Sequence, residues 1–182
     1  MNATPLPVRL RLEALHCAAL GLWLGGLVTV SATAALAFPT MKGLAPALPG
    51  FRVAIEEHPS IAAGHIMNPA FMGLMVAGVV LGAAALLAWR RLGAVRRLLS
   101  VLSLLLALGT LVGLGRPMAK HLDEYWTNAK AGELEVAAAA KSAFDGLHPW
   151  SSRALGSQAV LVAVSLGLGV WRIGSRSCGA SR

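Results

Sequence analysis

The sequence predicts an all-α fold: a bundle of four transmembrane helices with a helical extramembrane segment between the third and fourth spans. Of the 182 residues, 56% are hydrophobic and only 13% are charged, whereas globular domains carry about 25% charged residues. Four apolar runs approach the ~20 residues that cross a bilayer. So little charge cannot cover a water-facing surface, and lipid does not require it, so we expect one membrane-embedded domain.

The first predicted span covers residues 14–38 and ends at Pro39, because a proline interrupts helical hydrogen bonding. Residues 1–13 are expected to form a cytoplasmic N-terminus. A cleaved signal peptide is the alternative, since Arg9 and Arg11 precede the apolar run and the small residues ATAALA occur within it. The run is long for a signal peptide, which favours a retained span.

Three further spans are predicted at residues 61–89, 98–115 and 152–172. Arginines lie near both ends of the third and fourth spans. At about 1.5 Å per residue, even the short third span is about 27 Å long, which suits a thin or locally adjusted bilayer. Residues 173–182 then form a basic cytoplasmic tail.

Residues 117–148 are predicted to form the extramembrane helical segment. The stretch ELEVAAAAKSAF consists mostly of good helix formers and contains no proline. We expect His148 to end this helix, because the residue before a proline disfavours helical geometry.

The fourth span is expected to begin afresh around Pro149. Proline suits the first turn of a helix, and Ser151 or Ser152 would satisfy free amide groups there. Trp150 belongs at the headgroup level, where its amphipathic ring is favoured. This stretch would therefore combine a helix end, a helix start and an interface anchor.

The basic residues predict the orientation. The N-terminal segment, the link between the second and third spans and the tail hold nine of the sixteen Lys and Arg residues: Arg9, Arg11, Arg90, Arg91, Arg96, Arg97, Arg172, Arg176 and Arg182. The positive-inside rule then places both termini in the cytoplasm, most strongly through the RRLGAVRR link. We therefore expect a bacterial inner-membrane protein whose basic charge sets its topology and marks no nucleic-acid partner.

Small residues predict how the helices pack, because close backbone approach drives helix association in lipid. Glycines recur in the first three spans, often at four-residue spacing: Gly21, Gly25, Gly73, Gly78, Gly82, Gly109 and Gly113. This recurrence favours a compact bundle, while the alternative is the ordinary glycine content of membrane helices. The bilayer is the expected partner, and association with a second copy or another membrane protein is left open.

Three stretches carry a resemblance to a known family. They are GLWLGGLVTVSATAALAFP, AGHIMNPAFMG, and a motif before the last span formed by Phe144, Leu147, His148 and Ser151. Across residues 15–170 the chain resembles the transmembrane protein 205-like family, also described as domain of unknown function 4149. The resemblance implies a four-helix integral membrane protein with no established reaction. The chain departs from the family's pattern at Pro149 and Trp150, where glycine and an aliphatic residue are expected.

Histidines are the candidate metal ligands. Four of the five lie at or beyond the outer surface in this topology: His58, His65, His121 and His148. Imidazole binds copper, zinc or haem iron, and Met67, Met72 and Met118 would add thioether ligands for copper(I). No His-x-x-x-His or Cys-x-x-Cys spacing occurs. We therefore expect solvated interfacial histidines and no cofactor, with a copper- or haem-handling membrane protein as the alternative.

Polar residues within the spans are few. No charged residue lies clearly at mid-span, so the usual signature of a transport path is missing. The interior polar candidates are Thr29, Ser31, Thr33, Ser103, Thr110, Ser157, Gln158 and Ser165. A buried amide in lipid needs a partner on another helix, so Gln158 is expected to hold helices together.

No sequence pattern indicates catalysis. Hydrolase, phosphate-loop and nucleotide motifs are absent, and Cys17 and Cys178 show neither disulfide nor metal spacing. The sequence therefore predicts a non-enzymatic multi-pass membrane protein with a structural, accessory or small-solute-related role. A transporter for a neutral solute is a third hypothesis.

Overall fold

The computed structural model describes residues 8–179, and its described side chains exclude those of Arg9, Arg91 and residues 173–179. Residues 1–7 and 180–182, which belong to the predicted N-terminal segment and tail, lie outside the described residues. Within the described range the chain is almost entirely helical and has no strand. Four helical stretches are long and apolar enough to cross a membrane, which confirms the predicted all-α, four-span fold.

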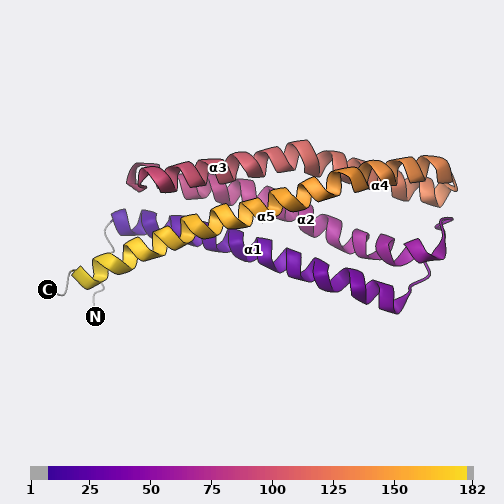
Figure 1. Cartoon of the computed structure of the whole chain (residues 1–182), viewed down its shortest axis with the longest axis horizontal. Coiled ribbons are helices and arrows are strands. Elements are labelled where there is room, and N and C mark those ends of the chain that lie inside the picture. Colours follow the sequence, from indigo (N-terminus) through magenta and orange to yellow (C-terminus); the bar gives the residue numbers. More distant parts are fainter. Residues whose placement is uncertain (1–7, 180–182) are drawn as a thin grey trace.

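The first half of the chain forms two long helices. Helix α1 (Val8–Leu44) is followed by an irregular link and the short helix η1 (Ile55–Glu57). Helix α2 (His58–Leu86) then packs along α1, and the short helix η2 (Trp89–Arg91) leads into the second half (Figure 1).

The second half forms a long hairpin. Helix α3 (Ala94–Thr110) continues through the π-helix η3 (Leu111–Gly115) into α4 (Arg116–Ala131), so that three elements make one rod. Helix α5 (Leu134–Gly179) then returns along α4, α3 and α1 (Figure 1).

The two ends of the bundle differ in chemistry. At the basic end, α1 begins, α5 ends and η2 connects α2 to α3 (Figure 1), so that Arg11, Arg97 and Arg172 come together at one end. At the opposite hairpin end, Gly132 closes the α4–α5 turn with a left-handed φ of 87°. Its N–H donates to the Asn128 carbonyl over 3.0 Å, which satisfies one of the last carbonyls of α4.

The described surface of the spans is apolar. Large aliphatic side chains such as Leu22, Val80 and Leu105 are exposed, while the buried set includes serine, threonine, glutamine and charged residues. A protein in water shows the opposite distribution. The arrangement suits helices surrounded by lipid, where aliphatic side chains cost nothing to expose.

Trp23 is the largest fully buried side chain and joins α1 to α2. Its indole lies where a Cβ on Gly78 would come within 2.8 Å and a Cβ on Gly82 within 3.1 Å. The two glycines of α2 are therefore required to let the indole lie against the helix backbone. Gly78 and Gly82 thus pack against a large side chain, Trp23, rather than against small residues of another helix.

The other five predicted packing glycines do not fulfil that role within the chain. A Cβ added at any of them would meet nothing within 4 Å: Gly21, Gly25, Gly73, Gly109 and Gly113. Gly21 is half-buried, and the other four are exposed. Spacing alone could not distinguish these glycines from packed ones, because glycine is frequent on both sides of membrane helices.

A line of buried polar side chains follows the facing surfaces of α3 and α5. Its members, here called the polar seam, are Ser100, Ser103, Thr110, Gln158 and Ser165. Gln158 Nε2 donates to Thr110 Oγ1 over 3.1 Å, and the Thr110 hydroxyl donates to the Leu106 carbonyl over 2.6 Å. The expected partner of Gln158 on another helix is thereby confirmed.

Not every predicted interior polar residue lies inside. Ser103, Thr110, Gln158 and Ser165 are buried, as expected. The remaining four are exposed: Thr29, Ser31, Thr33 and Ser157. Thr33 donates its hydroxyl to the Thr29 carbonyl over 2.8 Å, so a threonine hydroxyl facing lipid is satisfied by its own helix.

Two predicted helix ends are wrong. Helix α1 passes Pro39 and ends at Leu44, and α5 passes both His148 and Pro149 without interruption. Ser151 therefore caps no helix start, but is buried inside the bundle. A proline within a helix removes one hydrogen bond, and packing of α5 against α4 on one side of Pro149 and against α1 and α3 on the other outweighs that loss.

The extramembrane segment also differs from the prediction. Residues 117–148 do not form a separate helical unit. They belong to α4 and to the first part of α5, both continuous with spans. The hairpin thus lengthens the bundle beyond the four spans instead of lying beside it. The second span also begins slightly earlier than predicted, at His58.

A substitution at Gly78 tests the Trp23 packing. Gly78→Ala should destabilise the protein by about 1–3 kcal/mol, because the buried indole cannot move away from the new methyl group. Gly73→Ala, on the open face of the same helix, should leave the thermal midpoint in detergent unchanged or raise it, since alanine favours helix. Equal midpoints for the two variants would contradict the packing described.

The Gln158–Thr110 bond can be measured by a double-mutant cycle. Gln158→Leu and Thr110→Val should each destabilise the protein, and the two losses should be less than additive by about 0.6 kcal/mol, the usual coupling of such bonds in membrane proteins. Unfolding in mixed micelles provides the measurement. Strictly additive losses would show that the bond does not contribute to stability.

Candidate functional site

A large hollow, here called the lateral cavity, lies between α1, α2, α5 and the η3–α4 junction. Its volume is about 790 Å³. Residues from Leu27 to Pro39 form one wall, residues from Gly64 to Met75 a second, and residues from Phe144 to Ala159 a third. The cavity therefore occupies the half of the bundle toward the hairpin end (Figure 1).

The lining is apolar and adaptable. Four of the six methionines of the chain contribute to it: Met67, Met72, Met75 and Met118. Three of the four phenylalanines join them: Phe38, Phe71 and Phe144. Methionine side chains are unbranched and polarizable and adjust to ligands of different shape. An apolar molecule would therefore be well accommodated.

A few polar groups interrupt this lining. They are Ser31, Asn68, His148, Ser151 and Ser152. Apolar walls with a small number of polar groups are the usual composition of a small-molecule site. None of the five is an Asp, Glu, Lys or Arg, so the described lining offers hydrogen bonds and no carboxylate, ammonium or guanidinium group.

Irregular helix positions surround the cavity. Pro39 belongs to its lining, and Pro149 follows the lining residue His148. In the fourth wall, at the η3–α4 junction, the π-helix η3 ends at Gly115, another lining residue, two positions before Pro117. Proline cannot donate to the carbonyl four residues earlier, and π-turns frequently occur at functional sites. The walls are thus the least regular parts of the helices.

The motif behind the family resemblance converges on this cavity. Phe144, His148 and Ser151 all line it, whereas Leu147 is half-buried and is not part of the lining. The Phe144 and His148 rings are stacked with centroids 5.7 Å apart. Three of the four motif residues thus form one face of α5 that is directed toward a single hollow.

The four candidate metal-binding histidines have other roles. His58 Nδ1 accepts the Leu48 N–H over 3.0 Å, and His65 stacks on Trp126 at 3.7 Å between ring centroids. His121 Nδ1 lies 3.2 Å from a carboxylate oxygen of Glu124. Among residues 8–179, apart from the undescribed side chains, no three His, Cys, Asp or Glu side chains lie close enough to hold a metal ion. The geometry adds no support for the copper or haem alternative.

A buried polar cluster at the basic end was not predicted. Glu13, His16 and Arg96 are all buried. The sequence predicts Glu13 in the N-terminal segment and Arg96 in the link between the second and third spans. His16 Nδ1 lies 3.0 Å from the Ala85 carbonyl and donates to it, which ties α1 to α2. A Cβ on Gly169 would come within 3.1 Å of the Arg96 guanidinium and 2.8 Å of the Cys17 sulfur. This glycine lets α1, α3 and α5 converge around the charged groups.

Sequence reasoning missed the lateral cavity as a site. Met67 and Met72 were considered only as copper ligands, and Asn68 was not singled out. A usable signal was the placement of prolines, since Pro39, Pro69 and Pro149 each lie within a few residues of the lining on three different helices.

Comparison with protein-family models, with curated proteins and with solved structures gives no match for this chain.

Proposed function

We propose that this chain is a non-enzymatic, multi-pass protein of the bacterial inner membrane that holds one lipophilic small solute in the lateral cavity. The cavity itself is the observation on which the proposal depends. Its volume of about 790 Å³ falls within the roughly 300–1,000 Å³ of ordinary ligand sites. Its apolar lining and few neutral polar groups match a molecule with an apolar body and a small polar end.

Exposed tryptophans indicate where the bilayer would lie. Trp150 and Trp171 on α5 are 60% and 74% exposed. At 1.5 Å per residue, the helix between them is about 31 Å long, which is close to the hydrocarbon thickness of a bilayer. Tryptophan is favoured at both interfaces. The Arg153 guanidinium over the Trp150 ring, 5.1 Å from its centroid, suits the same level.

With the headgroups at the level of Trp150, the lateral cavity would have a polar end and an apolar end. His148 and Ser152 lie beside Trp150 in the sequence of α5, at the proposed headgroup level. Leu155 and Ala159, one and two turns further along the helix, line the part that would face acyl chains. An amphiphile would therefore place its polar end near His148 and its chain toward Ala159.

The orientation and the family assignment are parts of the same proposal. The clustering of arginines at the basic end supports a cytoplasmic position for both termini. The resemblance to the transmembrane protein 205-like family is consistent with a four-span protein without a known reaction, and membership stays a prediction.

Photo-crosslinking tests the cavity. The purified chain would be incubated with a long-chain alcohol carrying a diazirine near its hydroxyl-distal end, irradiated and mapped by peptide mass spectrometry. We expect labels on the lining residues toward which the alkyl chain of the alcohol points, such as Leu155 and Ala159. Labels spread evenly over outward residues such as Val80 and Leu105 would indicate ordinary lipid contact and overturn the proposal.

A matched pair of variants strengthens this test. Gly156 lines the cavity and Gly167 does not, both are exposed on α5, and an added Cβ meets nothing within 4 Å at either position. Gly156→Trp should reduce cavity labelling at least tenfold because the indole fills the space. Gly167→Trp should leave labelling unchanged.

Cysteine accessibility tests the orientation. With Cys17 and Cys178 replaced by serine, single cysteines at Ala94 in the α2–α3 link and at Ala131 beside the hairpin turn should react with a membrane-impermeant maleimide from opposite sides. In intact cells only the Ala131 position should be labelled. Labelling of the Ala94 position alone would reverse the topology.

A further inference from the structure

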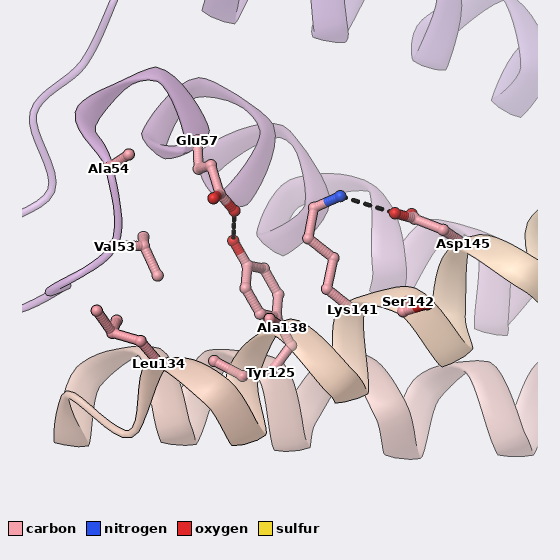
Figure 2. A pocket seen from close by; sticks show the side chains of 10 residues that line it. Val53, Ala54, Glu57, Tyr125, Leu134, Ala138, Lys141, Ser142 and Asp145 are labelled. Atoms are coloured by element: carbon pink, nitrogen blue, oxygen red, sulfur yellow. Dashed lines mark hydrogen bonds and ion pairs between the residues drawn. The ribbon is translucent and has the colours of Figure 1, made fainter.

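A second hollow, here called the hairpin pocket, lies at the far end of the bundle from the termini. Its volume is about 400 Å³. One side comes from the segment that leads into α2, with Val53, Ala54 and Glu57, and the other from α4 and α5 (Figure 2). The pocket is lined by different residues from the lateral cavity and does not depend on the function proposed there.

The hairpin pocket has one apolar side. Val53 and Ala54 face Leu134 across it, and Ala137 and Ala138 of α5 add small side chains (Figure 2). Small and aliphatic groups leave room for a short carbon chain but offer it no hydrogen bonds. This side can therefore hold only a compact apolar group.

The other side combines a carboxylate with an aromatic ring. Tyr125 is 5% exposed and donates its hydroxyl to Glu57 Oε2 over 2.5 Å. The bond joins α4 to the residue that precedes α2, and so fixes the carboxylate at the mouth of the pocket, above the ring (Figure 2). A carboxylate near an aromatic ring is a suitable combination for an ammonium group, which both attract.

The charges of the pocket are not balanced. Lys141 Nζ lies 2.7 Å from Asp145 Oδ2, so these two lining residues neutralise each other. Glu57 accepts a hydrogen bond from the uncharged Tyr125 hydroxyl, which leaves a net negative charge on the pocket. An incoming anion would meet this carboxylate and would have to displace Asp145 from Lys141. A cation meets neither obstacle.

We propose that the hairpin pocket binds a small organic ammonium ion, with the ammonium group on the Glu57 carboxylate and a short apolar substituent against Val53, Ala54 and Leu134. A bare metal cation fits less well, since hard cations require several oxygen ligands and Glu57 is, among the described lining residues, the one carboxylate outside the Lys141–Asp145 pair. The apolar side gives an alkylated amine an advantage over ammonium itself.

Calorimetric titration of the full chain in a non-ionic detergent tests the proposal, with n-propylammonium chloride as the probe and n-propanol as the uncharged match. Propylammonium should bind saturably and propanol should not. Glu57→Gln keeps an acceptor for the Tyr125 hydroxyl and should weaken propylammonium binding at least tenfold. Glu56→Gln removes the neighbouring exposed carboxylate, which lies outside the pocket, and should change the affinity for propylammonium less than twofold.

A second pair of variants blocks the pocket without altering charge. Ala138→Trp should abolish binding because Ala138 lines the pocket, whereas Ala139→Trp, one residue further on an exposed face, should not. The proposal is overturned if the wild-type chain shows no saturable binding, if propanol competes as well as the amine, or if Glu57→Gln binds like the wild type.

The ammonium group has two natural sources, a soluble amine or an ethanolamine headgroup. Nanodiscs of phosphatidylglycerol alone and of phosphatidylglycerol mixed with phosphatidylethanolamine separate them. Weaker propylammonium binding in the mixture supports the headgroup, and equal binding supports a soluble amine. Either result is consistent with ammonium recognition. Failure of the lateral cavity to take up the alcohol probe would not affect the proposal for the hairpin pocket.

Discussion

The apolar environment around the spans is the constraint on which the rest of the structure depends. Aliphatic side chains such as Leu22 and Val80 can face outward at no cost, so polar side chains are directed into the bundle. Gln158 finds its partner there in Thr110. This bond links α3 to α5 in the bundle interior, where apolar packing in lipid would leave their relative sliding weakly determined.

Close packing at mid-bundle and the lateral cavity nearer the hairpin end are two results of the same helix arrangement. Where the Trp23 indole lies against Gly78 and Gly82, α1 and α2 are held closely together and no space remains. Toward the hairpin end, α1, α2 and α5 each contain a proline and the π-helix η3 joins α3 to α4, and the lateral cavity lies among them. Flexible methionine side chains line this space and can adjust to its shape.

Hydropathy and length were sufficient to predict four spans and the all-α class, and the cost of a buried amide was sufficient to predict a partner for Gln158. Helix continuity through Pro39 and Pro149 could not be predicted, because the local preference of proline is outweighed by packing against helices that are distant in sequence. The lateral cavity could not be predicted for a related reason, since its walls come from four elements. Exposed glycines could not be distinguished from packed ones either, because Gly73 and Gly109 have the same spacing as packed glycines. Glu57 and Tyr125 are 68 positions apart, and nothing in either neighbourhood indicates the other.

The π-helix η3 also determines where the chain can change in length. A π-turn contains one residue more than an α-turn over the same arc, so the inward face of α3 ends at Thr110 and resumes at Gly115, from which Tyr125 and Ala129 follow at helical spacing. Loss of one residue from Leu111–Gly115 would turn this arc into ordinary α-helix and keep both faces directed inward. The same loss within α3 or α4 would rotate one packed face by about 100°. Among related chains, single-residue length differences in this rod are therefore expected to concentrate at the π-turn.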